Sequence, residues 1–391
     1  MSAGSSQRVD RHFVVAAAAV ALLPILAVAL FATPAGAKRH APQVKFMTLN
    51  LTLGADLLTA AHSQSFDELK DNVGVILNDV RKNNFPVRAK GLASEILRKK
   101  PDLVALQEVS LWRTEPCTLD IFPPKAKDVL YDYQKLLMRH LNKGEKQYRV
   151  VISQPEFDFE TQANTDASPD HSCDINARLT ERDEVILARR GAGVKTRHAK
   201  AAHFDELLVE RISGIDIPVT RGWARVDANV RGSGWFRFVD THLEAFDNQA
   251  INDTNQGTDV GNGDVRNAQA KELFANGGPA TGDKPVILAG DLNSDVKTPL
   301  KPGDSAAFWS LLQAGFAERA THDPLSCCLE GDSLAVGDGA NASQLDHMVD
   351  HIMTNDPRHV RRVRTSVTGR KPHNGFWNSD HAGLFSTLGF H

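Results

Sequence analysis

Polar residues capable of chemistry recur in this 391-residue chain at the ends of short apolar segments. In α/β proteins, active-site residues collect at strand ends and in the loops that follow them. We therefore predict that these residues meet in one site. They are Asn50, Glu108, His242, Asp291, Asn293, Asp350, Asp380 and His381.

The residue types predict a site for a divalent cation and a phosphate ester. The carboxylates of Glu108 and Asp380 are hard oxygen ligands, which suit Mg²⁺, Mn²⁺ or Ca²⁺. The sequence has no cysteine or multi-histidine cluster that would favour zinc. Hydrolysis of a phosphoester needs charge neutralisation, a positioned water and a protonated leaving group. The cation and His242 can supply the first, and His381 with a carboxylate partner can supply the second.

Each motif taken singly has an ordinary structural explanation. A histidine after a strand is more often structural, Gly290 can simply permit a turn, and Asp350 can be a buried, hydrogen-bonded carboxylate. Asn50 begins an Asn-Leu-Thr glycosylation sequon, although a cleft position would leave it unmodified. The order of six motifs along the chain, rather than any one of them, favours a functional site.

The hydrophobic pattern predicts the elements that must position these residues. Short apolar runs rich in β-formers predict strands buried on both faces, and apolar residues at helical spacing predict helices. The expected strands are 44–49, 102–106, 185–187, 235–239, 286–288, 349–353 and 383–385, and the expected helices are 89–97, 129–141, 267–274 and 308–312. The longest expected loops are 153–176 and 245–264. Because no repeat or shift of composition divides the chain, we expect one α/β domain.

The composition allows a large core and does not indicate a dedicated nucleic-acid-binding module. Hydrophobic residues make up 41% of the chain and the formal net charge is -3. Nucleic-acid binders usually carry clustered Lys and Arg, and a basic bias is missing here.

The N-terminus predicts export. Arg8 and Arg11 precede an apolar run from Phe13 to Phe31, and the small residues Ala35 and Ala37 follow at alternate positions. These are the three parts of a secretory signal, so residues 1–37 are expected to be a signal peptide and 38–391 the catalytic domain. The alternative is an uncleaved membrane anchor, because the run is close to the ~20 residues that span a bilayer. Either reading places the protein outside the cytoplasm, secreted or membrane-anchored.

Four cysteines, Cys117, Cys173, Cys327 and Cys328, predict disulfides in an oxidising compartment. Adjacent cysteines rarely bond each other, so Cys327 and Cys328 can each pair with Cys117 or Cys173, or stay reduced. A zinc site is less favoured because a C-x-x-C spacing is missing.

The motifs NLTLG, PDLVALQEV, DTHLEA, VILAGDLNSD, MVDHIM and SDHAGL together resemble the endonuclease/exonuclease/phosphatase superfamily, from Val44 to about Leu388. The residues around these motifs resemble those of a secreted bacterial branch of this superfamily. The resemblance implies a four-layer α/β sandwich, in which two mainly antiparallel sheets pack together and helices flank them.

The resemblance also implies a role for each motif residue. Glu108 matches the principal metal ligand with Asn50 beside it, and Asp380 a second metal contact. His242 matches the histidine that stabilises the scissile phosphate, and Asn293 the residue that holds a phosphate oxygen. Asp291 matches the aspartate that activates the attacking water or assists the leaving group. Asp350 matches the carboxylate that orients His381. His381 matches a general base or a hydrogen-bond donor to the phosphate, and the sequence does not decide whether Asp291 or His381 is the base.

The implied function is a metal-dependent phosphoric ester hydrolase that acts on a phosphodiester, either nucleic acid or a phospholipid headgroup, as a monomer without an obligate protein partner. The alternative is a non-catalytic secreted or surface binding protein that retains the fold. Phe376 and Trp377 are candidates for lining the substrate cleft. Further candidates, for which we favour surface or salt-bridge roles, are Arg178, Asp183, Arg266 and Gln269.

Overall fold

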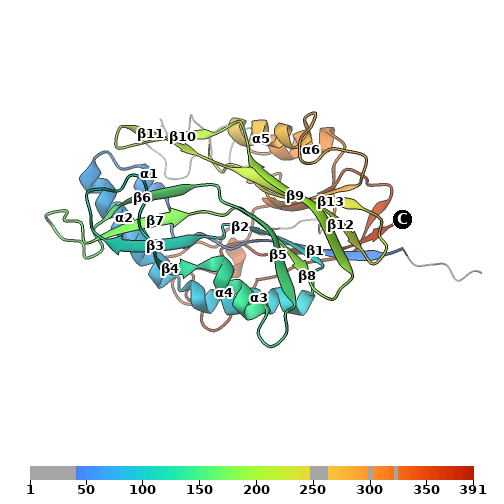
Figure 1. The fold of residues 1–391 in the computed structure, drawn as a ribbon, viewed down its shortest axis with the longest axis horizontal. Coiled ribbons are helices and arrows are strands. Elements are labelled where there is room, and N and C mark those ends of the chain that lie inside the picture. The colour runs from blue at the N-terminus through green and yellow to red at the C-terminus, as the bar shows by residue number, and fades with distance from the viewer. Residues whose placement is uncertain (1–40, 247–262, 298–302, 321–324) are drawn as a thin grey trace, which may run out of the picture. The chain divides into compact units, whose positions relative to one another are not determined.

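Two six-stranded sheets that pack face to face form the centre of the structure (Figure 1). The computed structural model describes residues 41–246, 263–297, 303–320 and 325–391, and Ala41–His391 form one compact unit. In spatial order the first sheet contains β17 (Val360–Val367), β18 (Leu384–Phe390), β1 (Gln43–Asn50), β2 (Leu103–Gln107), β8 (Glu184–Arg189) and β5 (Tyr148–Gln154). The second contains β15 (Ala317–Glu318), β16 (Asp350–Thr354), β14 (Val286–Asp291), β13 (Phe236–His242), β12 (Gly222–Val230) and β9 (Val194–His203).

Helices cover the outer face of each sheet, so the fold is the expected four-layer sandwich. The helices are α1 (Leu58–Ala61), α2 (Phe66–Lys82), α3 (Phe85–Lys99), α4 (Tyr133–Leu141), α5 (Asp264–Phe274) and α6 (Ala306–Gln313). One apolar cluster joins the first sheet to α2, α3 and α4, and another joins the second sheet to α5 and α6. Figure 1 shows α3 and α4 on one side of the sheets and α5 and α6 on the other.

The sequence of β2 explains why its run is apolar without interruption. Leu103 and Ala105 belong to the cluster between the two sheets, whereas Val104 and Leu106 belong to the cluster under the helices. Successive side chains of a strand point to opposite faces. Both faces of this sheet are therefore buried, as the sequence pattern predicts.

Two smaller β-elements extend the fold beside the sandwich. A four-stranded sheet has the order β4 (Asp128–Asp132), β3 (Leu111–Pro116), β7 (Ile175–Thr180) and β6 (Asp158–Ala163). A hairpin consists of β10 (Leu208–Ile212) and β11 (Ile215–Val219). The turn of this hairpin reaches the α1–α2 junction, where the Ser213 amide donates to the Ser63 carbonyl at 3.1 Å.

Strand register brings the predicted site residues together. The parallel pair β1–β2 sets Asn50 beside Gln107, immediately before Glu108. The parallel pair β13–β14 sets His242 beside Asp291, and the antiparallel pair β14–β16 sets Asp291 beside Asp350. These residues are distant in sequence but lie at adjacent strand termini.

Two sequence-based expectations about local structure are wrong. Residues 129–141 were expected to form one helix, but Val129 to Asp132 pair with β3 and only Tyr133–Leu141 is helical. The Asp132 carboxylate accepts the Lys135 amide at 3.0 Å and begins the helix there, while pairing with β3 keeps the residues before it extended. The expected loop 153–176 contains β6, whose edge pairs with β7.

The predicted signal peptide lies outside the described residues, so its cleavage stays a prediction. In the part of the chain that the structure describes, we find no helix with the length and apolar character needed to cross a membrane.

Candidate active site

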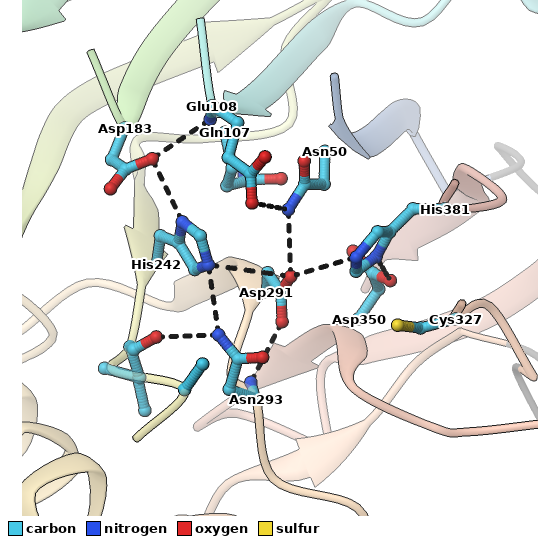
Figure 2. Close-up of polar contacts among 12 residues, drawn as sticks. Asn50, Gln107, Glu108, Asp183, His242, Asp291, Asn293, Cys327, Asp350 and His381 are labelled. Atoms are coloured by element: carbon cyan, nitrogen blue, oxygen red, sulfur yellow. Dashed lines mark hydrogen bonds and ion pairs between the residues drawn. The ribbon is translucent and has the colours of Figure 1, made fainter. Parts of the chain in front are cut away.

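A buried carboxylate, Asp291, lies between two histidines at the centre of the site (Figure 2). Its Oδ2 is 3.7 Å from Nε2 of His242 and 3.7 Å from Nε2 of His381. Asn50 donates to the same oxygen at 3.1 Å, and the Asn293 amide donates to Oδ1 at 2.9 Å. Burial acts to raise the pKa of Asp291, but the positive charges of His381 and His242 outweigh it and lower the pKa.

Each histidine is held from behind by a second buried carboxylate. Nδ1 of His381 is 2.8 Å from Asp350, and Nδ1 of His242 is 3.0 Å from Asp183. Burial acts to lower both histidine pKa values, but the carboxylates dominate. The pKa of His381 is raised well above its usual range, mainly by Asp350 and then by Asp291. The pKa of His242 is raised to about 9, chiefly by Asp183. Both pKa shifts favour the protonated ring, and each ring turns its Nε2 toward Asp291.

Asn293 completes the group around His242. Its Nδ2 lies 3.0 Å from Nε2 of His242 and donates to the Leu243 carbonyl at 2.9 Å. This position next to both His242 and Asp291 is compatible with the predicted role of binding a phosphate oxygen.

Three residues of the site have backbone conformations that L-amino acids rarely adopt. The φ angles of Thr52, Glu108 and Asn293 are 62°, 55° and 46°. Left-handed conformations of non-glycine residues cost about 1 kcal/mol or more and cluster at functional sites. Thr52, Glu108 and Asn293 each lie one or two residues after the end of a central strand. The chain turns there, and the side chain of each residue lines the pocket.

Glu108 is held by both of its carboxylate oxygens. Asn50 donates to Oε1 at 2.9 Å, and the Leu53 amide donates to Oε2 at 2.6 Å. The Glu108 amide donates to Asp183 at 3.0 Å, which links this glutamate to the His242 pair. Burial raises the pKa of Glu108, and the negative charge of Asp380 raises it further.

Asp380 lies in the loop before β18 and is fixed to the loop after β1. The Thr52 hydroxyl bonds its Oδ1, and the Asp380 amide donates to that hydroxyl at 3.0 Å. Arg88 of α3, fully buried, donates to the Leu51 carbonyl at 2.8 Å and to the Asn378 carbonyl at 3.0 Å. This one guanidinium ties together the two loops that carry Thr52 and Asp380.

The oxygen donors at this end of the site fit a hard divalent cation. Glu108 and Asp380 line the same pocket, and their negative charges oppose each other. A cation between them would relieve this repulsion, and carboxylate oxygens are the ligands that Mg²⁺ prefers. The oxygen of Asn50 accepts the Thr52 amide at 2.9 Å, while its Nδ2 orients Glu108. The assignment of Asn50 as a ligand stays a prediction.

Sequence reasoning placed Asp183 near the cleft but favoured a surface or salt-bridge role. The structure has it fully buried, bonded to Arg221 and behind His242. Burial acts to raise its pKa, but Arg221 and then His242 hold it below the usual range. The one feature of the sequence that indicates a site role for Asp183 is its position, one residue before strand β8. Arg221 also pairs with Glu181 at 3.1 Å and Glu244 at 3.4 Å.

The other sequence candidates act through ion pairs or hydrogen bonds, and Arg266 also lines the pocket and donates to the Asn293 carbonyl. Arg266 is buried and pairs with Asp304 at 2.8 Å, and Arg178 pairs with Asp158, as the salt-bridge reading expects. Gln269 is also buried and accepts the Glu244 amide at 2.8 Å. The expectation that Phe376 and Trp377 line the cleft is wrong. Trp377 packs into a separate apolar cluster because its indole donates to the Ala340 carbonyl at 3.1 Å.

Cys117 and Cys173 form a disulfide that joins the ends of the paired strands β3 and β7, with Cα atoms 5.9 Å apart. Because these two cysteines pair with each other, neither is a partner for Cys327 or Cys328, which lie next to each other on the pocket wall. Sγ of Cys328 lies 3.9 Å from Nε2 of His381, so this pair forms part of the pocket wall.

A pocket of about 830 Å³ opens from these residues. Besides the catalytic candidates, its lining comes from α1 and α2, from β6 and β7, and from the β10–β11 hairpin. Much of this lining is apolar, including Leu58, Val73, Phe159, Leu179 and Leu208. The site therefore offers a charged end for a phosphate and an apolar wall beside it.

Comparisons with known proteins agree with this architecture. The model of the Endonuclease/Exonuclease/phosphatase family matches residues 72–381. Comparison with curated protein sequences found no match. Among solved structures, an endonuclease/exonuclease/phosphatase from Bacteroides vulgatus is similar over 90% of this chain and 100% of its own, at 13% identity and a TM-score of 0.50.

Two proteins of Bacteroides thetaiotaomicron are also similar, each at 14% identity. One, an endonuclease/exonuclease/phosphatase family protein, is covered over 99% of its length and covers 90% of this chain, with a TM-score of 0.49. The other, a mannosyl-6-phosphatase, is covered over 100% and covers 89%, with a TM-score of 0.48. At such identities the likeness concerns the fold alone. The family model, which spans most of the chain, shows that this protein belongs to the endonuclease/exonuclease/phosphatase family, whose members are hydrolases of phosphate esters.

Proposed function

We propose that the protein is an exported, divalent-metal-dependent phosphodiesterase that hydrolyses its substrate by attack of water. The observation that carries the proposal is the position of Asp291 midway between two histidines, each with a second carboxylate on its Nδ1. This arrangement sets one proton acceptor between two cationic donors. It suits a reaction in which water loses a proton while negative charge grows on a phosphate.

The charge of each residue suggests its role in the reaction. We assign Asp291 as the general base, because its pKa is lowered and it stays ionised between two imidazolium rings. His242 and His381 would then donate to phosphate oxygens through Nε2, and Asp183 and Asp350 keep both rings oriented and charged. Asn293 would hold a further phosphate oxygen.

Glu108 and Asp380, with Asn50 beside them, would hold the cation. When bound, Mg²⁺ or a similar ion would neutralise negative charge on the phosphate and help to orient it. The proposal of export is supported by the composition of residues 1–37 alone. The preference for a diester is supported by the pocket, which extends well beyond the room needed for one phosphate group.

The test is a substrate panel with two histidine variants. The chain from Lys38 onward is incubated with Mg²⁺ or Mn²⁺ and bis(p-nitrophenyl) phosphate, p-nitrophenyl phosphate, plasmid DNA, RNA and sphingomyelin. We expect metal-dependent release from at least one diester, loss of it in His381→Ala, and retention of it in His359→Ala, since His359 is exposed and lies outside the pocket. If the wild type releases nothing beyond His381→Ala on any substrate, the chain is the non-catalytic binding protein instead.

A further inference from the structure

One glutamate on the pocket wall takes no part in the proposed hydrolysis. Glu210 lies in the middle of β10, whose alternate residues Leu208, Glu210 and Ile212 line the pocket. Across the hairpin these three face Val219, Ile217 and Ile215. Glu210 is therefore the single charged side chain on an otherwise aliphatic face of the hairpin.

Glu210 is buried without a compensating charge. The residue is 5% exposed, and its Oε2 has no hydrogen-bond partner among the described residues. Burial of an ionisable group without a partner is unfavourable, so such groups are rare in folded proteins and call for an explanation. Burial and the nearby charge of Glu244 raise the pKa of Glu210 to about 7.

The positive charges along the pocket are already engaged. Arg221 is paired with Asp183, Glu181 and Glu244, and Arg266 with Asp304. No lysine is among the described residues that line the pocket. Binding of an extended polyanion depends on available Lys and Arg side chains. The wall around Glu210 instead suits a group that is apolar and positively charged.

The surroundings favour an organic cation over a metal ion. In the described ranges of the chain, Glu210 belongs to no cluster of three or more His, Cys, Asp or Glu side chains with ligand atoms within 4.8 Å of one another. Hard metal ions need several oxygen ligands. The same pocket is lined by the rings of Phe157 and Phe159, whose centroids are 5.8 Å apart. Aromatic faces attract ammonium groups.

We propose that Glu210, with the apolar side chains around it, forms a subsite for an organic cation, a protonated amine or quaternary ammonium carried by the substrate. The substrate is then a zwitterionic phosphoester, with its phosphate at Asp291 and its ammonium at Glu210. This inference rests on the proposed function in treating the pocket as the substrate site.

The first experiment measures binding and does not depend on hydrolysis. Isothermal titration compares choline with neohexyl alcohol, in which carbon replaces the ammonium nitrogen. We expect choline to bind the wild type about tenfold more tightly or better, because a charge-assisted contact in a buried setting has that magnitude. Glu210→Gln should abolish the difference. Choline binding that is absent, or no tighter than that of the alcohol, overturns the proposal.

The matched control removes the same charge from the same hairpin. Asp216 of β11 is exposed, pairs with Arg211 at 2.7 Å and does not line the pocket. Asp216→Asn should keep the full choline preference. A thermal melt of each variant checks that it is folded. If Asp216→Asn loses the preference as Glu210→Gln does, the effect is a general charge effect and the subsite is refuted.

The second experiment uses catalysis to separate this inference from the proposed function. We compare kcat/KM for p-nitrophenyl phosphorylcholine and p-nitrophenyl neohexyl phosphate. The ratio should favour the choline ester in the wild type and fall about tenfold in Glu210→Gln. If neither ester is hydrolysed but choline binding depends on Glu210, the subsite stands and the hydrolase proposal fails on these substrates. If both are hydrolysed equally well, the hydrolase stands and the subsite is refuted.

Discussion

Asp183→Asn tests whether the carboxylate behind His242 sets the charge of that ring. In the structure, Asp183 raises the pKa of His242 from 6.5 to about 9 against the opposing effect of burial. That shift corresponds to about 3 kcal/mol of preference for the charged ring. Without the carboxylate, burial and Arg221 both lower the pKa of His242. At pH 7.5 the variant ring would therefore be neutral.

We expect kcat/KM of Asp183→Asn at pH 7.5 to fall about 100-fold, because the positive charge on the phosphate side is lost. The deficit should narrow below pH 6, where the variant imidazole regains its proton. The assay is initial-rate kinetics across pH on the best substrate of the panel, at a temperature where the variant is folded. Activity within about twofold of the wild type at pH 7.5 would refute the reasoning.

The control separates charge at the site from general loss of a buried ion pair. Asp227 of β12 is 2% exposed and pairs with Arg237 at 3.1 Å and Lys284 at 3.3 Å, away from the pocket. Breaking either buried pair should cost about 3–5 kcal/mol of unfolding free energy. Asp227→Asn should therefore be destabilised similarly while retaining activity. Equal losses of activity in both variants would mean that Asp183 acts only through stability.

Three further outcomes are expected. Burial raises the pKa of Glu210 from 4.5 to about 7, so the folded wild type holds this proton more tightly than the unfolded chain and loses stability as the pH rises from about 4.5 to 7. In urea unfolding, the stability of Glu210→Gln relative to wild type should therefore be about 2 kcal/mol greater at pH 8 than at pH 4. If the unfolding free energies of the two proteins change with pH in parallel, the charge of Glu210 is not buried. EDTA should abolish hydrolysis and Mg²⁺ restore it, whereas Glu108→Gln should need about tenfold more Mg²⁺; an unchanged requirement would exclude Glu108 as a ligand. The Cys117→Ala, Cys173→Ala double variant should lose about 4 kcal/mol of stability, because the bridge closes a loop with a sequence separation of 56 residues; an unchanged denaturation midpoint would contradict this.

The site was predictable because strand ends are visible in the sequence. Asn50, His242 and Asp291 each end a strand at or shortly after the end of an apolar run, so their polar types stand out against it. The roles of these residues stay predictions. Register sets His242 beside Asp291, and the packing of the two sheets brings Asn50 to 3.1 Å from Asp291. By contrast, residues 129–132 read as helix and form a strand, since their fate depends on a partner strand contributed by residues 111–116.

The sequence by itself determined the α/β class, most of the central strands and the chemical types at their ends, whereas the family resemblance supplied the four-layer arrangement. Apolar alternation and strand length are local properties, and local patterns are enough to specify which faces are buried. The tertiary structure alone decided the pairings: Asp183 with His242, Arg88 with two loops, and Glu210 on an apolar wall. Such pairings join residues far apart along the chain, and their electrostatics depend on burial. A carboxylate that reads as an ordinary surface charge in sequence can therefore become, once desolvated, the group that sets the chemistry of its neighbours.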